Sequence, residues 1–466
     1  MTYAHNNRRD RHPMTTDDVS IVLSGGGAKG SFEVGAMAYL TTKYHFKPRV
    51  LSGTSMGAIL AVQLAQAHTP EDLARLVQEV RQSMLDVADP TEIFTKAPWL
   101  AEYDDTRLGK LIESLLATQT ATRPPRHSAL GQHGRKKTDD ISAMRVMTSI
   151  AAHPLHSLHL IQNMRSLPLS FMVMDPLENA LRGIVDGAFK AIDEEAVRTS
   201  GIALRMPVTA LRAGTTRLVT ESGVIIDNYE DTVIEGAGHP GVIEGTLASA
   251  SIPVIFEPRQ IGDDYYVDGG AIRNLPVIPA RRAGATNVIA IAASPLDPSP
   301  IEWQAAEHGF LNVLGRVAAI TAMDSSRRSA LEQPRENFTM TVIHPTLSPV
   351  GVLETSRPLL NMNFDYGWLR AAETVEFEPE DALPFVAVSD DIINTRELAY
   401  FLELEITEAV ADTGKVPKDG LADLEVLRAH VRSRAQEWVT SGLTPPVELE
   451  TWGHAPEHPD FAEIEA

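Results

Sequence analysis

The stretch from Arg49 to Leu64, RVLSGTSMGAILAVQL, constrains the fold of this chain more than any other. The apolar pair Val50-Leu51 leads into the turn GTSMG, and a helix-forming run follows. Strand, tight turn and helix in this order are the context in which G-x-S-x-G indicates a nucleophilic serine, here Ser55. Cβ atoms two residues to either side would crowd the turn, so Gly53 and Gly57 meet a steric demand. The alternative is an ordinary turn with a capping serine.

The segment before this turn has the same order of elements. Val19–Leu23 is a short apolar run typical of a buried parallel strand, the loop Ser24–Gly30 is rich in glycine, and Ser31–Thr42 predicts a helix. A strand–helix–strand–helix unit predicts an α/β fold, in which a parallel sheet carries helices on its faces.

Composition limits the function. The 466 residues are 43% hydrophobic, carry a net charge of -21 and include no cysteine. Disulfides, thiolate nucleophiles and cysteine-based metal sites are therefore excluded. The acidic charge should repel phosphate backbones, so we expect no nucleic-acid partner. The N-terminal residues 1–17 form no secretory signal and predict a disordered arm, and no run of about 18 apolar residues predicts a transmembrane helix. We expect a cytoplasmic protein, although secretion without a signal peptide would leave no such trace.

The rest of the chain shows helical and strand patterns in turn. Helices are predicted at 70–87, 105–116, 243–250 and 277–283, and strands at 205–212, 217–221, 287–292 and 338–343. A long amphipathic helix is expected at 303–331, with an apolar stripe that includes Val317 and Ile320 and faces the core. Phe364, Tyr366 and Trp368 are expected to pack the edge of the domain rather than line a substrate pocket.

Two polar segments stand apart. Residues 118–140 are basic and rich in helix breakers, which predicts a flexible surface insertion, with a lid as one possible role. His153, His156 and His159 follow at a spacing that walks around a helix, so we expect no metal site there.

The C-terminal residues 371–466 contain 22 acidic and 6 basic side chains, a net charge of -16. Helical patterns at 395–411 and 421–439 predict an acidic, mainly helical region appended to the sheet.

The glycine-rich loop Ser24–Gly30 has two interpretations, a dinucleotide-binding loop and an oxyanion hole. Gly25, Gly27 and Gly30 satisfy G-x-G-x-x-G, the dinucleotide fingerprint. Dinucleotide binding needs a carboxylate near the end of the next strand, where Leu51-Ser52-Gly53 stands instead. Successive glycines also expose backbone N–H groups to one point, as an oxyanion hole requires.

Asp268-Gly269-Gly270 closes a predicted hairpin at 258–267 and precedes Ala271-Ile272-Arg273-Asn274-Leu275-Pro276. A lone D-G-G is most often a turn. Four stretches together, SGGGAKGSFEVG, GTSMG, TLASASIPVIFEP and VDGGAIRNLPV, closely resemble the patatin-like phospholipase family. The resemblance covers about residues 19 to 295, and one departure is Ser24, where many members have aspartate.

The resemblance implies a three-layer α/β/α fold with a mostly parallel central sheet. It implies a serine–aspartate dyad, with Ser55 as nucleophile and Asp268 as base. The backbone N–H groups of Gly26, Gly27 and Ala28 would form the oxyanion hole. Supporting roles fall to the other motif residues: Gly25, Lys29, Gly30, Gly53, Gly57, Gly269 and Gly270. No cofactor or metal is implied.

The expected activity is hydrolysis of fatty-acyl esters of lipids or phospholipids through an acyl-enzyme. The expected partners are this substrate and, transiently, a membrane or micelle surface. A general carboxylesterase or an acyltransferase is the alternative, and a dinucleotide-binding protein is the alternative from another class. The expected organisation is an arm at 1–17, a hydrolase domain at 18–370 and the acidic region at 371–466.

Overall fold

The structure is a computed structural model that describes residues 18–87, 89–99, 170–187, 189–297, 310–331, 337–417, 419–446 and 461. The predicted arm, the helix at 105–116, the insertion at 118–140 and the three histidines at 153–159 lie outside these residues.

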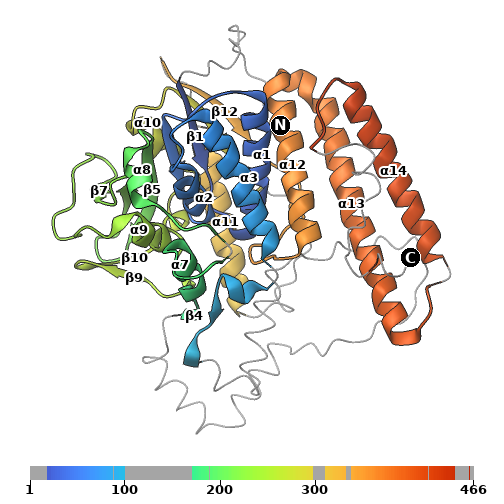
Figure 1. The fold of residues 1–466 in the computed structure, drawn as a ribbon, viewed down its shortest axis with the longest axis horizontal. Helices are drawn as coiled ribbons and strands as arrows, with labels where there is room; N and C mark the ends of the chain where they lie inside the picture. Colours follow the sequence, from blue (N-terminus) through green and yellow to red (C-terminus); the bar gives the residue numbers. More distant parts are fainter. Residues whose placement is uncertain are drawn as a thin grey trace.

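Within the described residues, nine strands form a central sheet (Figure 1). Its parallel part runs in the order β12 (Thr339–Ile343), β11 (Asn287–Ile291), β1 (Val19–Leu23), β2 (Val50–Gly53) and β5 (Ala203–Ala210). The antiparallel strands that extend it are β10 (Asp264–Asp268), β9 (Arg259–Ile261), β6 (Thr215–Thr220) and β7 (Ile225–Asp227).

The sheet is therefore mixed. Two short connections account for part of its antiparallel pairing, and one of them is the predicted hairpin at 258–267. The turns between β5 and β6 and between β9 and β10 are too short for a crossover helix, so the strands that they join pair antiparallel. The predicted helix-flanked α/β architecture is confirmed.

Alternating side chains divide the core between the two faces of the sheet. Ile21, Leu23 and Leu51 belong to one apolar cluster. Val22 and Val50, their neighbours along the strands, belong to the other. This period of two shows that both faces of the central strands are covered, as their continuous apolar runs require.

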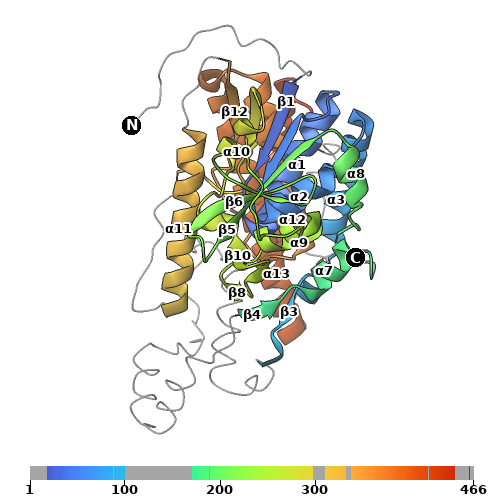
Figure 2. The same cartoon turned by 90° about the vertical axis from the view of Figure 1, so that its left-hand side faces the viewer.

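The larger cluster is covered by α1 (Gly30–Lys43), α2 (Met56–Leu64), α3 (Pro70–Asp86) and α9 (Gly241–Ser249). The opposite face carries α10 (Val277–Arg282) and α11 (Phe310–Ala330). Figure 2 shows α11 on one side of the sheet and α1 and α3 on the other. This is the expected three-layer arrangement.

One prediction for α11 is wrong. Val317 and Ile320 are 54% and 46% exposed, so this part of the apolar stripe does not face the core. The helix instead contacts the rest of the molecule near its C-terminal end, where Ser326 is buried and Ala330 packs against the smaller cluster.

A second, three-stranded sheet was not expected. It joins β3 (Thr95–Lys96), β4 (Ser170–Val173) and β8 (Val254–Phe256). These strands have two to four residues, and the helices that follow β4 in the chain, α7 (Asp175–Leu181) and α8 (Glu194–Thr199), are also short. Elements of this length leave too few residues for a periodic pattern.

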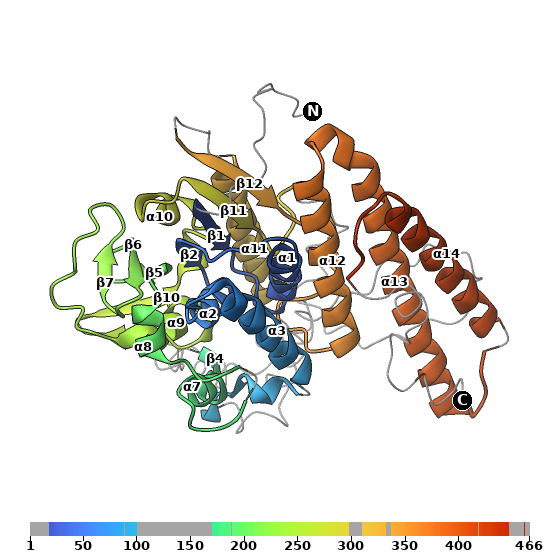
Figure 3. The same ribbon diagram turned by 45° about the horizontal axis from the view of Figure 1, so that its top comes forward.

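Within residues 344–446, apart from the undescribed 418, three helices follow β12, namely α12 (Arg357–Glu376), α13 (Pro379–Thr413) and α14 (Gly420–Thr440). Figure 3 shows them side by side, each farther from the sheet than the one before. α12 lies directly on α1, and two glycines allow this approach. A Cβ at Gly35 would lie 1.9 Å from the Phe364 carbonyl oxygen, and a Cβ at Gly367 would lie 1.9 Å from the Phe32 carbonyl oxygen. Phe364 and Tyr366 are buried in this contact, as predicted.

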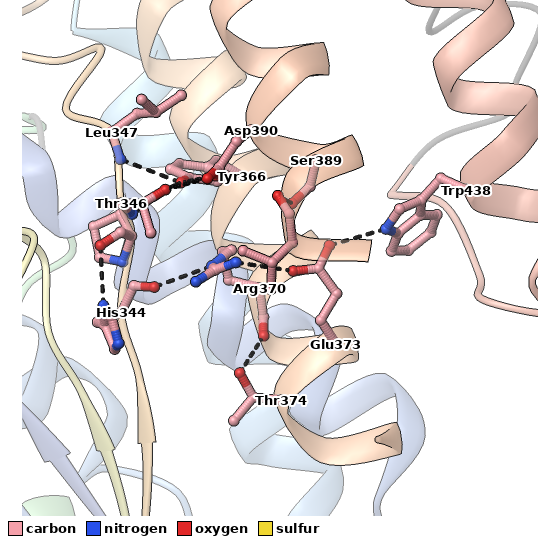
Figure 4. A network of polar contacts seen from close by, with 12 residues as sticks. His344, Thr346, Leu347, Tyr366, Arg370, Glu373, Thr374, Ser389, Asp390 and Trp438 are labelled. Carbon is pink, nitrogen blue, oxygen red and sulfur yellow. Dashed lines mark hydrogen bonds and ion pairs between the residues drawn. The ribbon is translucent and has the colours of Figure 1, made fainter. Parts of the chain in front are cut away.

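A buried polar network joins these helices to the sheet (Figure 4). The Arg370 guanidinium donates to the His344 carbonyl oxygen, just after β12, and to the Glu373 carboxylate at 3.2 Å. The Trp438 indole of α14 donates to Glu373 at 3.0 Å. Burial raises the pKa of Glu373 to about 7. The division between residues 370 and 371 stays a prediction, and α12 runs through it without a break.

No helix in the described ranges is long and apolar enough to cross a bilayer.

Candidate active site

Ser55 lies at the turn between β2 and α2. Its backbone has φ 57° and ψ -124°, a conformation that residues other than glycine rarely adopt. The Ser55 amide donates to the Ser249 hydroxyl of α9, and that hydroxyl donates to the Pro207 carbonyl oxygen of β5. Contacts with a second helix and strand therefore hold the strained turn.

The glycines on either side of Ser55 have no room for a side chain. A Cβ at Gly53 would lie 2.0 Å from the Gly57 carbonyl oxygen, and a Cβ at Gly57 would lie 2.4 Å from that of Ser24. The second distance shows that the serine turn packs directly on the loop after β1.

Asp268 is the last residue of β10, and the structure brings its side chain to Ser55. The Ser55 side chain lies against the Asp268 carboxylate and favours its charged form. The Gly270 amide donates to the same carboxylate at 2.6 Å. Backbone contacts fix this end of the strand, because the Asp268 amide donates to the Ser251 carbonyl oxygen and the Thr209 hydroxyl donates to that of Asp268.

Burial dominates the electrostatics of this pair. Asp268 is 5% exposed, and desolvation raises its pKa to about 6. The hydrogen bonds from Ser55 and Gly270 favour the charged form and oppose part of this rise. A carboxylate with a pKa near 6 is a stronger base than an exposed aspartate and is still mostly ionised at neutral pH.

The glycine-rich loop after β1 lies beside this pair. Gly27–Lys29 forms a single 3-10 turn, with Gly27 at φ 58°. In the part of the chain that the structure describes, the amides of Gly26 and Gly27 have no hydrogen-bond partner. The Ala28 amide, by contrast, donates to the Val352 carbonyl oxygen at 2.8 Å. The three amides predicted to form one site thus differ in their bonding.

Ser24 and Glu33 fix the start of this loop. The completely buried Glu33 carboxylate accepts from the Ser24 amide at 2.6 Å and from its hydroxyl at 3.0 Å. The Ser24 hydroxyl in turn accepts from the Ala293 amide. Burial raises the pKa of Glu33. The Glu33 carboxylate of α1 thus holds Ser24, the residue that departs from the common motif.

The other motif residues contribute through the backbone. The Gly30 amide donates to the carbonyl oxygens of Gly27 and Ala28, and the Lys29 carbonyl oxygen accepts from the Asn363 amide group of α12. A Cβ at Gly269 would lie 2.2 Å from the Pro207 carbonyl oxygen. Close packing therefore explains the small residue next to Asp268.

A cavity opens beside Ser55, with an empty volume of roughly 760 Å³ that includes its open mouth. Its walls come from α2, from the C-terminal end of α3, from α7, from β8 and from the segment before α12. Methionine, leucine, isoleucine and phenylalanine side chains dominate these walls, among them Met56, Ile59, Met84, Phe94, Met174, Leu177 and Phe256. Such a lining suits an apolar chain rather than a charged head group.

Metal and histidine chemistry find no support in the described ranges. Those residues contain no group of three potential ligands that could hold a metal ion. The cavity-lining residues include no histidine.

Sequence reasoning missed several residues around the site. Asn274 stands in VDGGAIRNLPV, one of the four stretches that carry the family resemblance, so its place in that motif could have indicated a role at the site. Ser249 lies in another such stretch, but nothing there indicated a contact with Ser55. Val352 lies in a segment with no motif, about 300 residues from Ala28, and nothing local could have revealed its contact.

A sequence profile of the patatin-like phospholipase family matches residues 21–281, which is more than half of the chain. A search of curated proteins found no match. The profile spans β1, the serine turn and the Asp268 turn.

Solved structures align with low scores. VipD from Legionella pneumophila aligns over 97% of this chain and 88% of its own, with 14% identity and a TM-score of 0.27. The ExoU–SpcU complex of Pseudomonas aeruginosa aligns over 97% and 72%, with 15% identity and a TM-score of 0.24. These scores are too low to carry an argument, and the family assignment depends on the profile.

Proposed function

Because the chain belongs to the patatin-like phospholipase family, we propose that it is a serine lipid acyl hydrolase that works with a Ser55–Asp268 dyad. One observation carries this proposal. Ser55 lines an apolar cavity, and its side chain lies against the buried Asp268 carboxylate and favours the charged form of that carboxylate. This supports a site in which a nucleophile, a base and room for an acyl chain lie together.

In the first half-reaction, the Ser55 oxygen attacks the ester carbonyl carbon while its proton passes to Asp268. Negative charge develops on the carbonyl oxygen, and the proposed donors are the amides of Gly26, Gly27 and Ala28. When the intermediate collapses, the C–O bond to the alcohol breaks and Asp268 returns the proton to the leaving oxygen. The acyl group stays on Ser55.

In the second half-reaction, water attacks the acyl-enzyme and gives a proton to Asp268. Collapse of this intermediate breaks the bond to Ser55, which recovers the proton, and the fatty acid is released. No step needs a histidine or a metal. The apolar cavity binds the acyl chain and keeps water away from it.

The test is hydrolysis of p-nitrophenyl esters and phospholipids of graded chain length by the purified protein. We expect Ser55→Ala and Asp268→Asn each to lower kcat at least about 1,000-fold, because each removes a member of the dyad. Labelling by a fluorophosphonate should occur on Ser55. Full activity in a folded Ser55→Ala variant would contradict the proposal.

Added acceptor alcohols separate hydrolysis from acyl transfer. A hydrolase releases mainly free fatty acid, whereas a dominant ester product would identify an acyltransferase. Preference for short, water-soluble esters over lipids would instead indicate a general carboxylesterase. Vesicles and micelles in the same assay test the expected contact with a lipid surface.

A further inference from the structure

Asn274 lies between the two loops that carry the proposed catalytic groups. It is 8% exposed and follows Asp268 by six residues, beyond a 3-10 turn at Gly269–Ala271. Its side chain contacts neither Ser55 nor Asp268 through a hydrogen bond that would place it in the reaction. Its contacts are with the glycines next to them.

Two hydrogen bonds join Asn274 to Gly25, at the start of the proposed oxyanion loop. The Gly25 amide donates to the Asn274 carbonyl oxygen at 3.1 Å. In return, the Asn274 side-chain amide donates to the Gly25 carbonyl oxygen at 3.3 Å. Asn274 thereby bonds both the N–H and the C=O group of Gly25, directly before the amides of Gly26 and Gly27.

The same side chain fills the space between Gly25 and Gly270. A Cβ at Gly25 would lie 2.6 Å from the Asn274 Oδ1 and 3.0 Å from the Ser55 Cβ. A Cβ at Gly270 would lie 2.9 Å from the Asn274 Oδ1 and 2.9 Å from the Asp268 Oδ1. Gly25 is thus packed between Ser55 and Asn274. Gly270, whose amide donates to Asp268, lies against the same Asn274 Oδ1.

Helix α11 holds Asn274 from the other side. The Asn274 side-chain amide donates to the Ser326 hydroxyl at 2.9 Å, and its backbone amide donates to the Ser325 hydroxyl at 3.2 Å. Both N–H groups of the side chain are therefore used, one on the loop and one on the helix. The bond to Gly25 and the bond to the helix thus use different N–H groups, so either can be removed alone.

We propose that Asn274 is a positioning residue, which sets the distance between the oxyanion loop and the Ser55–Asp268 pair. The inference rests on the proposed function. Asn274 donates no proton to the substrate and binds no part of it. Its loss moves Gly25 and Gly270 relative to each other, and a displacement of about 1 Å in such a site costs about 100-fold in rate.

The experiment compares Asn274→Ala, the isosteric Asn274→Asp and the matched control Ser326→Ala. Ser326→Ala removes the side-chain bond to α11 and leaves the Ser325 bond and both bonds to Gly25. We expect kcat to fall about 100-fold in both Asn274 variants, with KM within about twofold of the unchanged protein. Ser326→Ala should keep kcat within about threefold.

Hydrogen exchange of the peptide that spans Ser24–Gly30 gives a readout independent of activity. Exchange there should speed up in Asn274→Ala and stay unchanged in Ser326→Ala. If the unchanged protein hydrolyses no ester, the proposed function fails, and the exchange data alone decide on positioning. An unchanged kcat in Asn274→Ala would overturn the inference. Loss of the fold in both Asn274 variants would also overturn it, because it would assign the residue to stability.

Discussion

At the scale of single residues, the site combines backbone strain at Ser55 with a desolvated charge at Asp268. Neither is the most stable choice for a folded chain, since a left-handed serine costs about 1–3 kcal/mol and burial penalises an ionised carboxylate. In the proposed mechanism, both place reactive atoms where the reaction needs them. Stability and activity should therefore separate under substitution at these two positions.

Ser55→Gly tests the strain. Glycine adopts φ 57° and ψ -124° without a Cβ penalty, so we expect this variant to be about 1–2 kcal/mol more stable than Ser55→Ala. Both lack the hydroxyl, which makes the pair a matched comparison. Urea unfolding of the two proteins measures the difference, and equal stabilities would show that the turn is unstrained.

Asp268 predicts the pH dependence of the reaction. The base must be ionised to accept the Ser55 proton, and its pKa in the folded protein is about 6. We expect kcat/KM to be constant above about pH 7 and to fall about tenfold per unit below pH 6. A profile of p-nitrophenyl ester hydrolysis from pH 4 to 9 checks this. An inflection near 4 would mean that the carboxylate is not desolvated.

At the scale of elements, α1 and α12 form a close helix crossing next to the glycine-rich loop. Gly35 and Gly367 each leave room for a backbone carbonyl of the other helix. α1 begins where the glycine-rich loop ends, so α12 supports this loop from behind. Asn363 of α12, which donates to the Lys29 carbonyl oxygen, adds a direct contact.

Gly367→Ala should destabilise the protein by about 3 kcal/mol, because its Cβ would lie 1.9 Å from the Phe32 carbonyl oxygen and the helices would separate. The control is Gly414→Ala at the end of α13, where no atom lies within 4 Å and only the left-handed φ of 67° is lost. We expect about 1 kcal/mol there. Thermal unfolding of both variants checks the order, and a larger loss at Gly414 would contradict this account of the crossing.

The elements also show what local patterns could predict. The strands and helices of the central layers follow their apolar periods closely, and β1 has the bounds expected for Val19–Leu23. Short elements such as β3, β4 and β8 form through pairing with distant strands, which no window of the sequence contains. A clear local pattern can also mislead, as the exposed Val317 and Ile320 show. An apolar stripe shows that one face of a helix is apolar, but it does not show which element packs against that face.

At the scale of the whole molecule, the candidate site was predictable because its groups sit in short motifs at the ends of strands. Ser55 and Asp268 are 213 residues apart in the sequence, and their pairing came from a family resemblance rather than from spacing. The supporting contacts were not predictable in this way. Glu33, Asn274 and Val352 act through packing of the complete fold, and only the structure brings them together.

The contact of Val352 with Ala28 has a thermodynamic consequence. If Ala28 supplies one of the proposed donors, the Val352 carbonyl oxygen and a substrate oxyanion compete for the same N–H group. The free energy of the contact between Ala28 and the segment before α12 then lowers the binding free energy of any transition-state analogue. By linkage the effect is reciprocal, so an analogue bound at Ser55 weakens the contact of that segment with Ala28 by the same amount. Residues beyond the family match at 21–281 thus enter the binding constant of the site without touching the acyl group.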